Sequence, residues 1–134
     1  MRVLVSQHDG GSTDLLFLDK DTSTNDFFRV QSDTEVRAKI DGSTAMKWTT
    51  DTLQNDEFNN YGFERTEDND VSAYFNGAAL TASTVINNEN ILDIDAIGTN
   101  FDGKIKDVVI CCAPLSVTER TNLEAYLGSL TQGE

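Results

Sequence analysis

Two adjacent cysteines, Cys111 and Cys112, end an apolar run shortly before Pro114 and are the first candidates for chemistry. Neighbouring residues of a strand point to opposite faces, so these thiols are poorly placed to bond each other or to share a metal. A zinc site would need further ligands, and the chain holds no other cysteine and one histidine, His8. We therefore expect free thiols that fill space at the end of a strand and indicate folding in a reducing compartment, with an intersubunit disulfide as the alternative.

Catalytic groups are scarce in this chain. His8 lies in a predicted turn, QHDGG, with no constellation around it that would orient a catalytic base. Asp93 and Asp95 alternate in ILDIDAIG and face one side of a predicted strand. Glycoside hydrolysis needs two carboxylates at a fixed separation, but a solvated strand face produces the same pattern and is the favoured interpretation. We expect no catalytic residue.

Calcium is the one cofactor that the acidic residues suggest. Asp93, Asp95, Asn100 and Asp102 lie within one short span and offer the oxygen ligands that calcium prefers. The D-x-[DN]-x-[DN]-G loop is absent, and Asp and Asn also favour turns. These four residues are therefore a candidate calcium site, with turn formation as the competing interpretation.

A sugar-binding surface is the remaining candidate. Trp48 and Tyr61 would form an aromatic platform for a sugar ring if they were exposed, with Asn59 and Asn60 as polar neighbours. Aromatic residues more often fill the core of a β-sandwich, and that interpretation is favoured for Trp48.

Length and composition restrict the class of protein. The 134 residues fit one domain and are 38% hydrophobic. Acidic residues outnumber Lys and Arg by 23 to 10, giving a net charge of −13. This charge repels phosphate backbones, so we expect no nucleic-acid partner. No apolar run approaches the roughly 20 residues of a membrane span, so we expect no membrane insertion, and no signal peptide is recognisable.

Short β-rich segments separated by Gly, Asn, Asp and Ser predict an antiparallel β protein. In EVRAKI, the apolar residues alternate with Glu35, Arg37 and Lys39, as in a strand with one wet face. Asn76-Gly77 predicts a tight hairpin turn, after which AALTA returns beside the preceding strand. Polar loops are expected at 19–26, 51–60 and 66–70. Strands are predicted near residues 2–7, 14–19, 26–31, 35–40, 45–50, 58–66, 70–76, 91–97 and 104–112.

One helix is predicted near residues 116 to 128. Ser116 and Glu119 form a capping box, and Gly128 is the expected C-terminal cap. One apolar stripe is expected on this helix, formed by Leu123, Tyr126, Leu127 and Leu130. The predicted fold is an all-β, two-sheet antiparallel β-sandwich with a short C-terminal α-helix, built as a single domain over residues 1–134.

The run IGTNFDGKIKDVVICCAPLSVTERTNLEAYL, residues 97 to 127, resembles the closing motif of concanavalin A-like, laminin G-like jelly-roll domains. Upstream, FERTEDNDVSAYFNG resembles the paired strands of the same family that end in an aromatic-x-Asn-Gly turn, here Tyr74, Asn76 and Gly77. The matching positions of the closing motif are Ile97, Gly98, Phe101, Gly103, Ile105, Asp107, Leu115, Ser116 and Glu119. The resemblance covers residues 58 to 127, and it implies two packed antiparallel sheets.

The resemblance also implies a function. The family includes lectins, glucanases, adhesion modules and accessory domains of bacteriophage capsids, tails and fibres. The E-x-D-x-x-E strand of its glucanases is absent here. The pattern also lacks the first strands usual in the family, so we expect an open sheet edge that a neighbouring chain covers.

We expect a non-enzymatic virion component, a capsid decoration or fibre protein assembled in the host cytoplasm. Its partners would be other virion proteins or copies of itself. The alternative is a free, extracellular lectin for cell-surface glycans, and a glycoside hydrolase is the least favoured reading.

Overall fold

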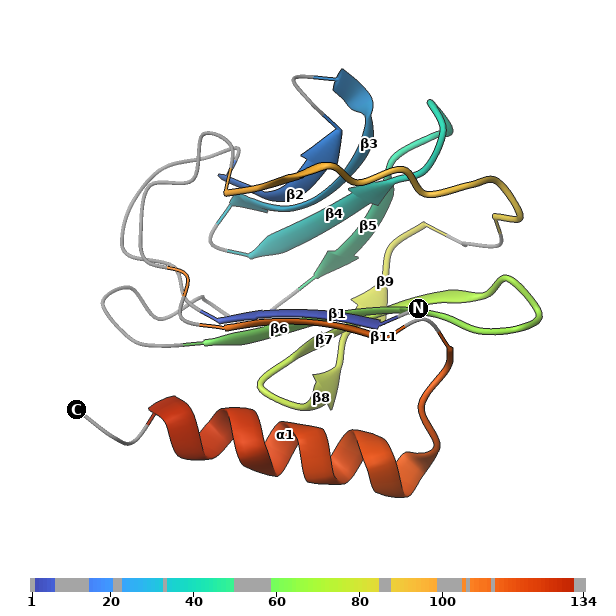
Figure 1. Cartoon of the computed structure of the whole chain (residues 1–134). Coiled ribbons are helices and arrows are strands. Elements are labelled where there is room, and N and C mark those ends of the chain that lie inside the picture. The colour runs from blue at the N-terminus through green and yellow to red at the C-terminus, as the bar shows by residue number, and fades with distance from the viewer. Residues whose placement is uncertain are drawn as a thin grey trace.

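The chain forms two antiparallel sheets that lie face to face, with one helix outside them (Figure 1). The computed structural model describes residues 2–6, 15–20, 23–32, 34–49, 59–84, 88–98, 105, 107–111 and 113–131. Within these residues the predicted all-β sandwich with one C-terminal helix is confirmed. None of the helical structure described there is long and apolar enough to cross a membrane.

The first sheet has five strands in the order β11-β1-β6-β7-β8. Its members are β1 (Arg2–Ser6), β6 (Asn60–Arg65), β7 (Val71–Phe75), β8 (Ala78–Ala79) and β11 (Val108–Cys111). Neighbouring strands pair antiparallel. This order places β6 at the centre and β11 at one edge.

The second sheet has six strands in the order β10-β2-β3-β4-β5-β9. Its members are β2 (Leu15–Lys20), β3 (Ser23–Ser32), β4 (Glu35–Lys39), β5 (Met46–Thr49), β9 (Thr81–Ala82) and β10 (Ala96–Ile97). The chain changes sheets after a single residue, Leu80, so β8 and β9 lie on the same side of the sandwich. The strands β10 and β11 are therefore the opposite edges of their two sheets.

Buried and half-buried side chains alternate along β4, as the sequence pattern predicts. In β4, Val36 and Ala38 are at most 1% exposed, whereas Glu35, Arg37 and Lys39 are half-buried on the outer face. Side chains of a strand point alternately to its two faces. Apolar residues at every second position therefore form a buried face, and the polar residues between them form a face toward solvent. The predicted strand with one wet face is confirmed.

The Asn76-Gly77 turn forms as predicted. Its residues have φ angles of 47° and 82°, the left-handed conformations that a tight hairpin turn requires. Ala78 and Ala79 return beside β7, as expected for the start of AALTA. Thr81 and Ala82 instead pair with β5 in the other sheet, so this short segment joins the two sheets.

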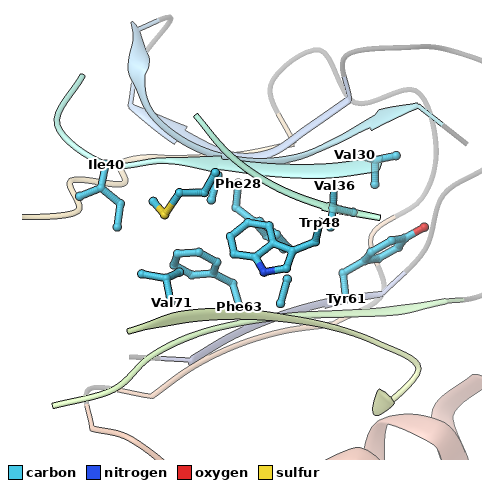
Figure 2. Packing of buried hydrophobic residues seen from close by; sticks show 11 residues of the cluster. Phe28, Val30, Val36, Ile40, Trp48, Tyr61, Phe63 and Val71 are labelled. Atoms are coloured by element: carbon cyan, nitrogen blue, oxygen red, sulfur yellow. The ribbon is translucent and has the colours of Figure 1, made fainter. Parts of the chain in front are cut away.

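Aromatic side chains fill the space between the sheets (Figure 2). The ring of Phe63 lies 5.3 Å from Phe28 and meets Trp48 edge-on at 85°, with 6.2 Å between centroids. Edge-to-face packing is favourable because the positive edge of one ring meets the negative face of another. Strands β3, β5 and β6 are thus joined through one aromatic cluster.

The central strand β6 is buried on both faces, because the helix α1 (Val117–Thr131) packs on the outside of its sheet (Figure 1). The side chain of Glu64 points to the helix side and is only 3% exposed. Nη2 of Arg120 lies 2.9 Å from Oε2 of Glu64, and the same guanidinium lies 4.9 Å from the ring centroid of Tyr74. Arg120 therefore joins the helix to β6 and β7.

The start of α1 is a capping box, as predicted. The backbone N–H of Ser116 donates to Oε2 of Glu119 at 2.9 Å, and the N–H of Glu119 donates to Oγ of Ser116 at 3.3 Å. The side-chain hydrogen bond from Ser116, followed by the backbone hydrogen bond, lowers the pKa of Glu119. Each side chain thus satisfies a backbone group that the first helical turn leaves without a partner.

The end of the helix differs from the prediction. α1 continues through Gly128 to Thr131, so Gly128 is an internal residue and not a C-terminal cap. Leu127 is 2% exposed and faces the sheet, whereas Tyr126 is 54% exposed. The predicted apolar stripe is therefore correct for Leu127 and wrong for Tyr126, which helical spacing alone placed beside it.

Two strand predictions also need correction. Only Ala96 and Ile97 of the predicted strand at 91–97 join a sheet. Residues 91 to 95 keep the alternating burial but no ladder, and the N–H of Asp93 donates instead to the side chain of Asp26 at 3.4 Å. The predicted loop at 19–26 is mostly strand, since β2 reaches Lys20 and β3 begins at Ser23.

Replacing Arg120 with Met is expected to lower the free energy of unfolding by about 3 kcal/mol, because it leaves the buried Glu64 carboxylate without its counter-ion. The double variant Glu64→Gln/Arg120→Met removes both charges and should recover most of that loss. Urea denaturation of the three proteins measures the difference. Equal losses of unfolding free energy in the single and double variants would show that the pairing of the two charges does not stabilise the fold.

Replacing Ser116 with Ala is expected to lower the free energy of unfolding by about 1 kcal/mol at neutral pH, because the capping box is lost. The neighbouring Thr118→Ala is the control, since that exposed residue lies outside the box. Because the pKa of Glu119 is lowered by folding, its stabilisation is present above the ordinary glutamate pKa and is lost as the pH falls through the lowered one. The difference between the two variants should therefore shrink in acid.

Candidate functional site

The residues predicted to bind a sugar lie inside the protein. Trp48, Asn59, Asn60 and Tyr61 are 1%, 2%, 6% and 0% exposed. The indole of Trp48 lies between the sheets, as the competing interpretation predicted (Figure 2). As placed, none of the four presents an exposed face to a ligand.

The two asparagines of this group have structural contacts. The N–H of Asn60 donates to Oδ1 of Asn76 at 2.8 Å, and Nδ2 of Asn76 donates to Oδ1 of Asn59 at 3.1 Å. The N–H of Asn76 also donates to the carbonyl oxygen of Asn60 at 2.8 Å. These bonds tie the start of β6 to the turn after β7, which gives Asn59 and Asn60 a role in the fold.

The predicted calcium ligands are only partly within the described residues. Asp93 and Asp95 are exposed on the segment before β10, and Asn100 and Asp102 lie outside the described part of the chain. Among the residues described, no group of three His, Cys, Asp or Glu side chains has the arrangement to hold a metal. The calcium site stays a prediction. The expectations of no chemistry at His8 and of a space-filling thiol at Cys112 also stay predictions, because both residues lie outside the described part of the chain. Cys111 is a half-buried free thiol.

An acidic cavity forms where sequence reasoning did not expect one. It is shallow, with a volume of about 520 Å³, and is lined by Asp26, Asp41, Glu89, Asn90, Ile91 and Asp93. Asp26 is 4% exposed, and its Oδ1 accepts the backbone N–H of Asp41 at 2.9 Å and of Asp93 at 3.4 Å. Its carboxylate therefore contacts both the turn after β4 and the segment before β10, two of the segments that line the cavity.

The edge formed by β10 and β11 is the clearest candidate for a binding surface. Two large apolar side chains are half exposed there, Ile97 at 54% on β10 and Ile110 at 51% on β11. The link between these strands returns to the core, because Ile105 packs against the central cluster and lies close to Gly98. We refer to the strands β10 and β11, with Ile97 and Ile110, as the β10/β11 edge.

Strand register shows why Ile110 is unusual. Ile110 stands opposite Val3, and Val3 stands opposite Phe63. Directly opposed residues share a face of the sheet, and Phe63 lies in the core. Ile110 therefore points to the inner face of its sheet, where Val108 packs against the core, yet half of its surface remains exposed. The described residues leave the sandwich incompletely covered at this edge.

The edge also offers hydrogen-bonding groups. β11 pairs with β1 on one side, and no described strand pairs with its other side. An unpaired strand presents a row of N–H and C=O groups that a further strand can bind. The open edge that the family resemblance implied, covered by a neighbouring chain, stays a prediction. The sequence could not show that Ile110 stands at an edge, since register depends on β1 and β6.

Burial raises the pKa of the Tyr61 hydroxyl above that of an ordinary tyrosine, about 10. The unfolded chain therefore loses this proton at a lower pH than the folded one, and stability should fall as the pH rises above about 10. In Tyr61→Phe this part of the fall should be absent, whereas Tyr126→Phe, at a half-exposed tyrosine, should keep it. Thermal unfolding between neutral and alkaline pH measures both, and identical profiles for all three proteins would contradict the assignment.

No family model matches the sequence, and no curated protein matches it. The resemblance of residues 58 to 127 to laminin G-like domains therefore stays a prediction, and the sandwich itself is what the structure establishes.

Proposed function

We propose that the chain is a non-enzymatic structural and binding module that docks on another protein through the β10/β11 edge. The observation that carries this proposal is the half-exposed Ile110, which points to the inner face of an edge strand. Burying an exposed apolar side chain stabilises a complex, and pairing with a free strand edge adds backbone hydrogen bonds. Both contributions are present in the same place.

The partner we propose is another protein of a virus particle, and the chain would be a capsid decoration or fibre protein of a bacteriophage. Support comes from the resemblance of residues 58 to 127 to domains that include such components. The lack of the E-x-D-x-x-E strand supports a module without catalytic activity. Glycan binding has weaker support, because the aromatic residues assigned to the sugar are buried.

The docking surface predicts the effect of two substitutions. Ile110→Asp and Ile97→Asp each place a charge where the partner would bury an apolar side chain, and each should reduce incorporation into particles by about tenfold or more. Val117→Asp is the matched control, because Val117 is also apolar and is 76% exposed, but it lies on α1. Quantitative mass spectrometry of purified particles measures incorporation, and circular dichroism checks the fold of each variant.

Two outcomes would count against the proposal in different ways. If particles contain no wild-type chain in stoichiometric amount, the assignment to a virus particle is wrong. If the chain is present but both edge variants are incorporated like the wild type, the docking surface is not this edge.

A further inference from the structure

The turn after β7 contains two residues that can react with each other. Asn76 and Gly77 are the one Asn-Gly pair in the chain. Glycine carries no side chain, so its backbone nitrogen is unshielded and its backbone rotates easily. That nitrogen can attack the carboxamide of the preceding asparagine, which is the reaction by which asparagine residues lose ammonia. Both residues are exposed, so water, the other reactant, reaches them.

The reaction has two steps, and neither needs an oxidant or a reductant. First the backbone nitrogen of Gly77 bonds to Cγ of Asn76 and the bond from Cγ to Nδ2 breaks. Nδ2 leaves as ammonia with the proton that the Gly77 nitrogen gave up, and the product is a cyclic imide. Water then opens this ring at one of its two carbonyl carbons. Opening at Cγ gives aspartate, and opening at the backbone carbonyl carbon of the same residue gives isoaspartate.

The fold holds the carboxamide of Asn76 at both of its polar atoms. Oδ1 accepts the backbone N–H of Asn60 at 2.8 Å, and Nδ2 donates to Oδ1 of Asn59 at 3.1 Å. The backbone N–H of Asn76 also donates to the carbonyl oxygen of Asn60 at 2.8 Å. Asn59 and Asn60 are buried, so their positions are fixed by the sandwich. The reactive side chain is therefore held in place although its residue is exposed.

The turn also keeps the two reacting atoms apart. The φ angles of Asn76 and Gly77, 47° and 82°, are both positive, which identifies a type I′ turn. In that turn ψ of the first residue is about 30°, the mirror image of the type I value. For an L-residue, this ψ places the Gly77 nitrogen on the opposite side of the Cα–C bond from Cβ. The nitrogen reaches Cγ only after ψ of Asn76 rotates, and that rotation breaks the turn.

We infer that Asn76 is a modification site controlled by the fold: it deamidates from an opened turn, and its contacts with Asn59 and Asn60 keep the turn closed. The rate in the folded protein is then the rate in an unfolded chain multiplied by the fraction of molecules whose turn is open. The turn adjoins β8, at the opposite edge of its sheet from β11. The inference is therefore separate from the β10/β11 edge and does not depend on the proposed virus partner.

Deamidation removes contacts that hold the turn closed. The aspartate product lacks the Nδ2 donor that Oδ1 of Asn59 accepts. The isoaspartate product adds Cβ to the main chain, so a two-residue turn no longer keeps Phe75 opposite Ala78. Because the chain crosses to the other sheet directly after β8, the modified turn loosens a link between the two sheets. Opening of the turn thus becomes permanent once the reaction has occurred.

Peptide mass spectrometry of the whole chain, kept in mildly alkaline buffer with and without urea, measures conversion of Asn76. The urea-unfolded chain should convert at least about tenfold faster than the folded chain. Asn59→Ala should speed conversion of the folded chain by about fivefold, because the closed turn loses one hydrogen bond. Val36→Ala is the control, since it destabilises the core at a residue of the other sheet and should convert like the wild type.

Hydrogen exchange of the wild type provides a second measurement that needs no variant. The ratio of folded to unfolded conversion rates should match the open fraction that the N–H groups of Asn60 and Asn76 report. Equal conversion in folded and unfolded chains, or faster conversion than this fraction allows, overturns the inference. It is also overturned if Asn59→Ala converts like the wild type, or if Val36→Ala is accelerated as much as Asn59→Ala. An unfolded chain that leaves Asn76 unmodified rules out the site itself.

Discussion

The burial of β6 on both faces is the constraint on which the rest of the structure depends. One face contributes Tyr61 and Phe63 to the core between the sheets, and the other lies under α1. A charge buried in this position is costly unless a counter-ion meets it, because water cannot reach it. Glu64 carries such a charge, and Arg120 supplies the counter-ion from the helix. The helix is thus placed by a charge in the centre of the sheet as well as by Leu127.

Polar contacts of the same kind hold the ends of the sandwich. Asp26 is buried and accepts two backbone N–H groups, one from the turn after β4 and one from the segment before β10. Asn76 joins its own turn to the start of β6. The buried acid and amide side chains that the structure describes therefore contribute to the fold, although Asn59 and Asn60 were predicted to bind a sugar. The β10/β11 edge is the binding surface that we propose.

Much of the fold could be predicted from local pattern. Alternation in EVRAKI, the Asn76-Gly77 turn and the Ser116/Glu119 capping box each involve residues within a few positions of one another, and each formed as predicted. One strand prediction failed where a distant residue intervened. The segment 91–95 is not a strand, and its Asp93 N–H bonds to Asp26, which lies 67 positions away in sequence. Gly128 does not end the helix, and helical spacing could not show that Tyr126 faces solvent.

The sequence by itself determined the class of the protein, because hydrophobic period, turn residues and helix caps are local properties of the chain. It also determined the net charge of −13. Only the tertiary structure decided which side chains became neighbours. Register across β3, β4 and β5 placed Arg29, Arg37 and Lys47 in one row, and register across β6, β1 and β11 placed Ile110 at an incompletely covered edge. The physical reason is that strand pairing joins residues far apart in the chain, so a shift of one position would turn each of these side chains to the other face.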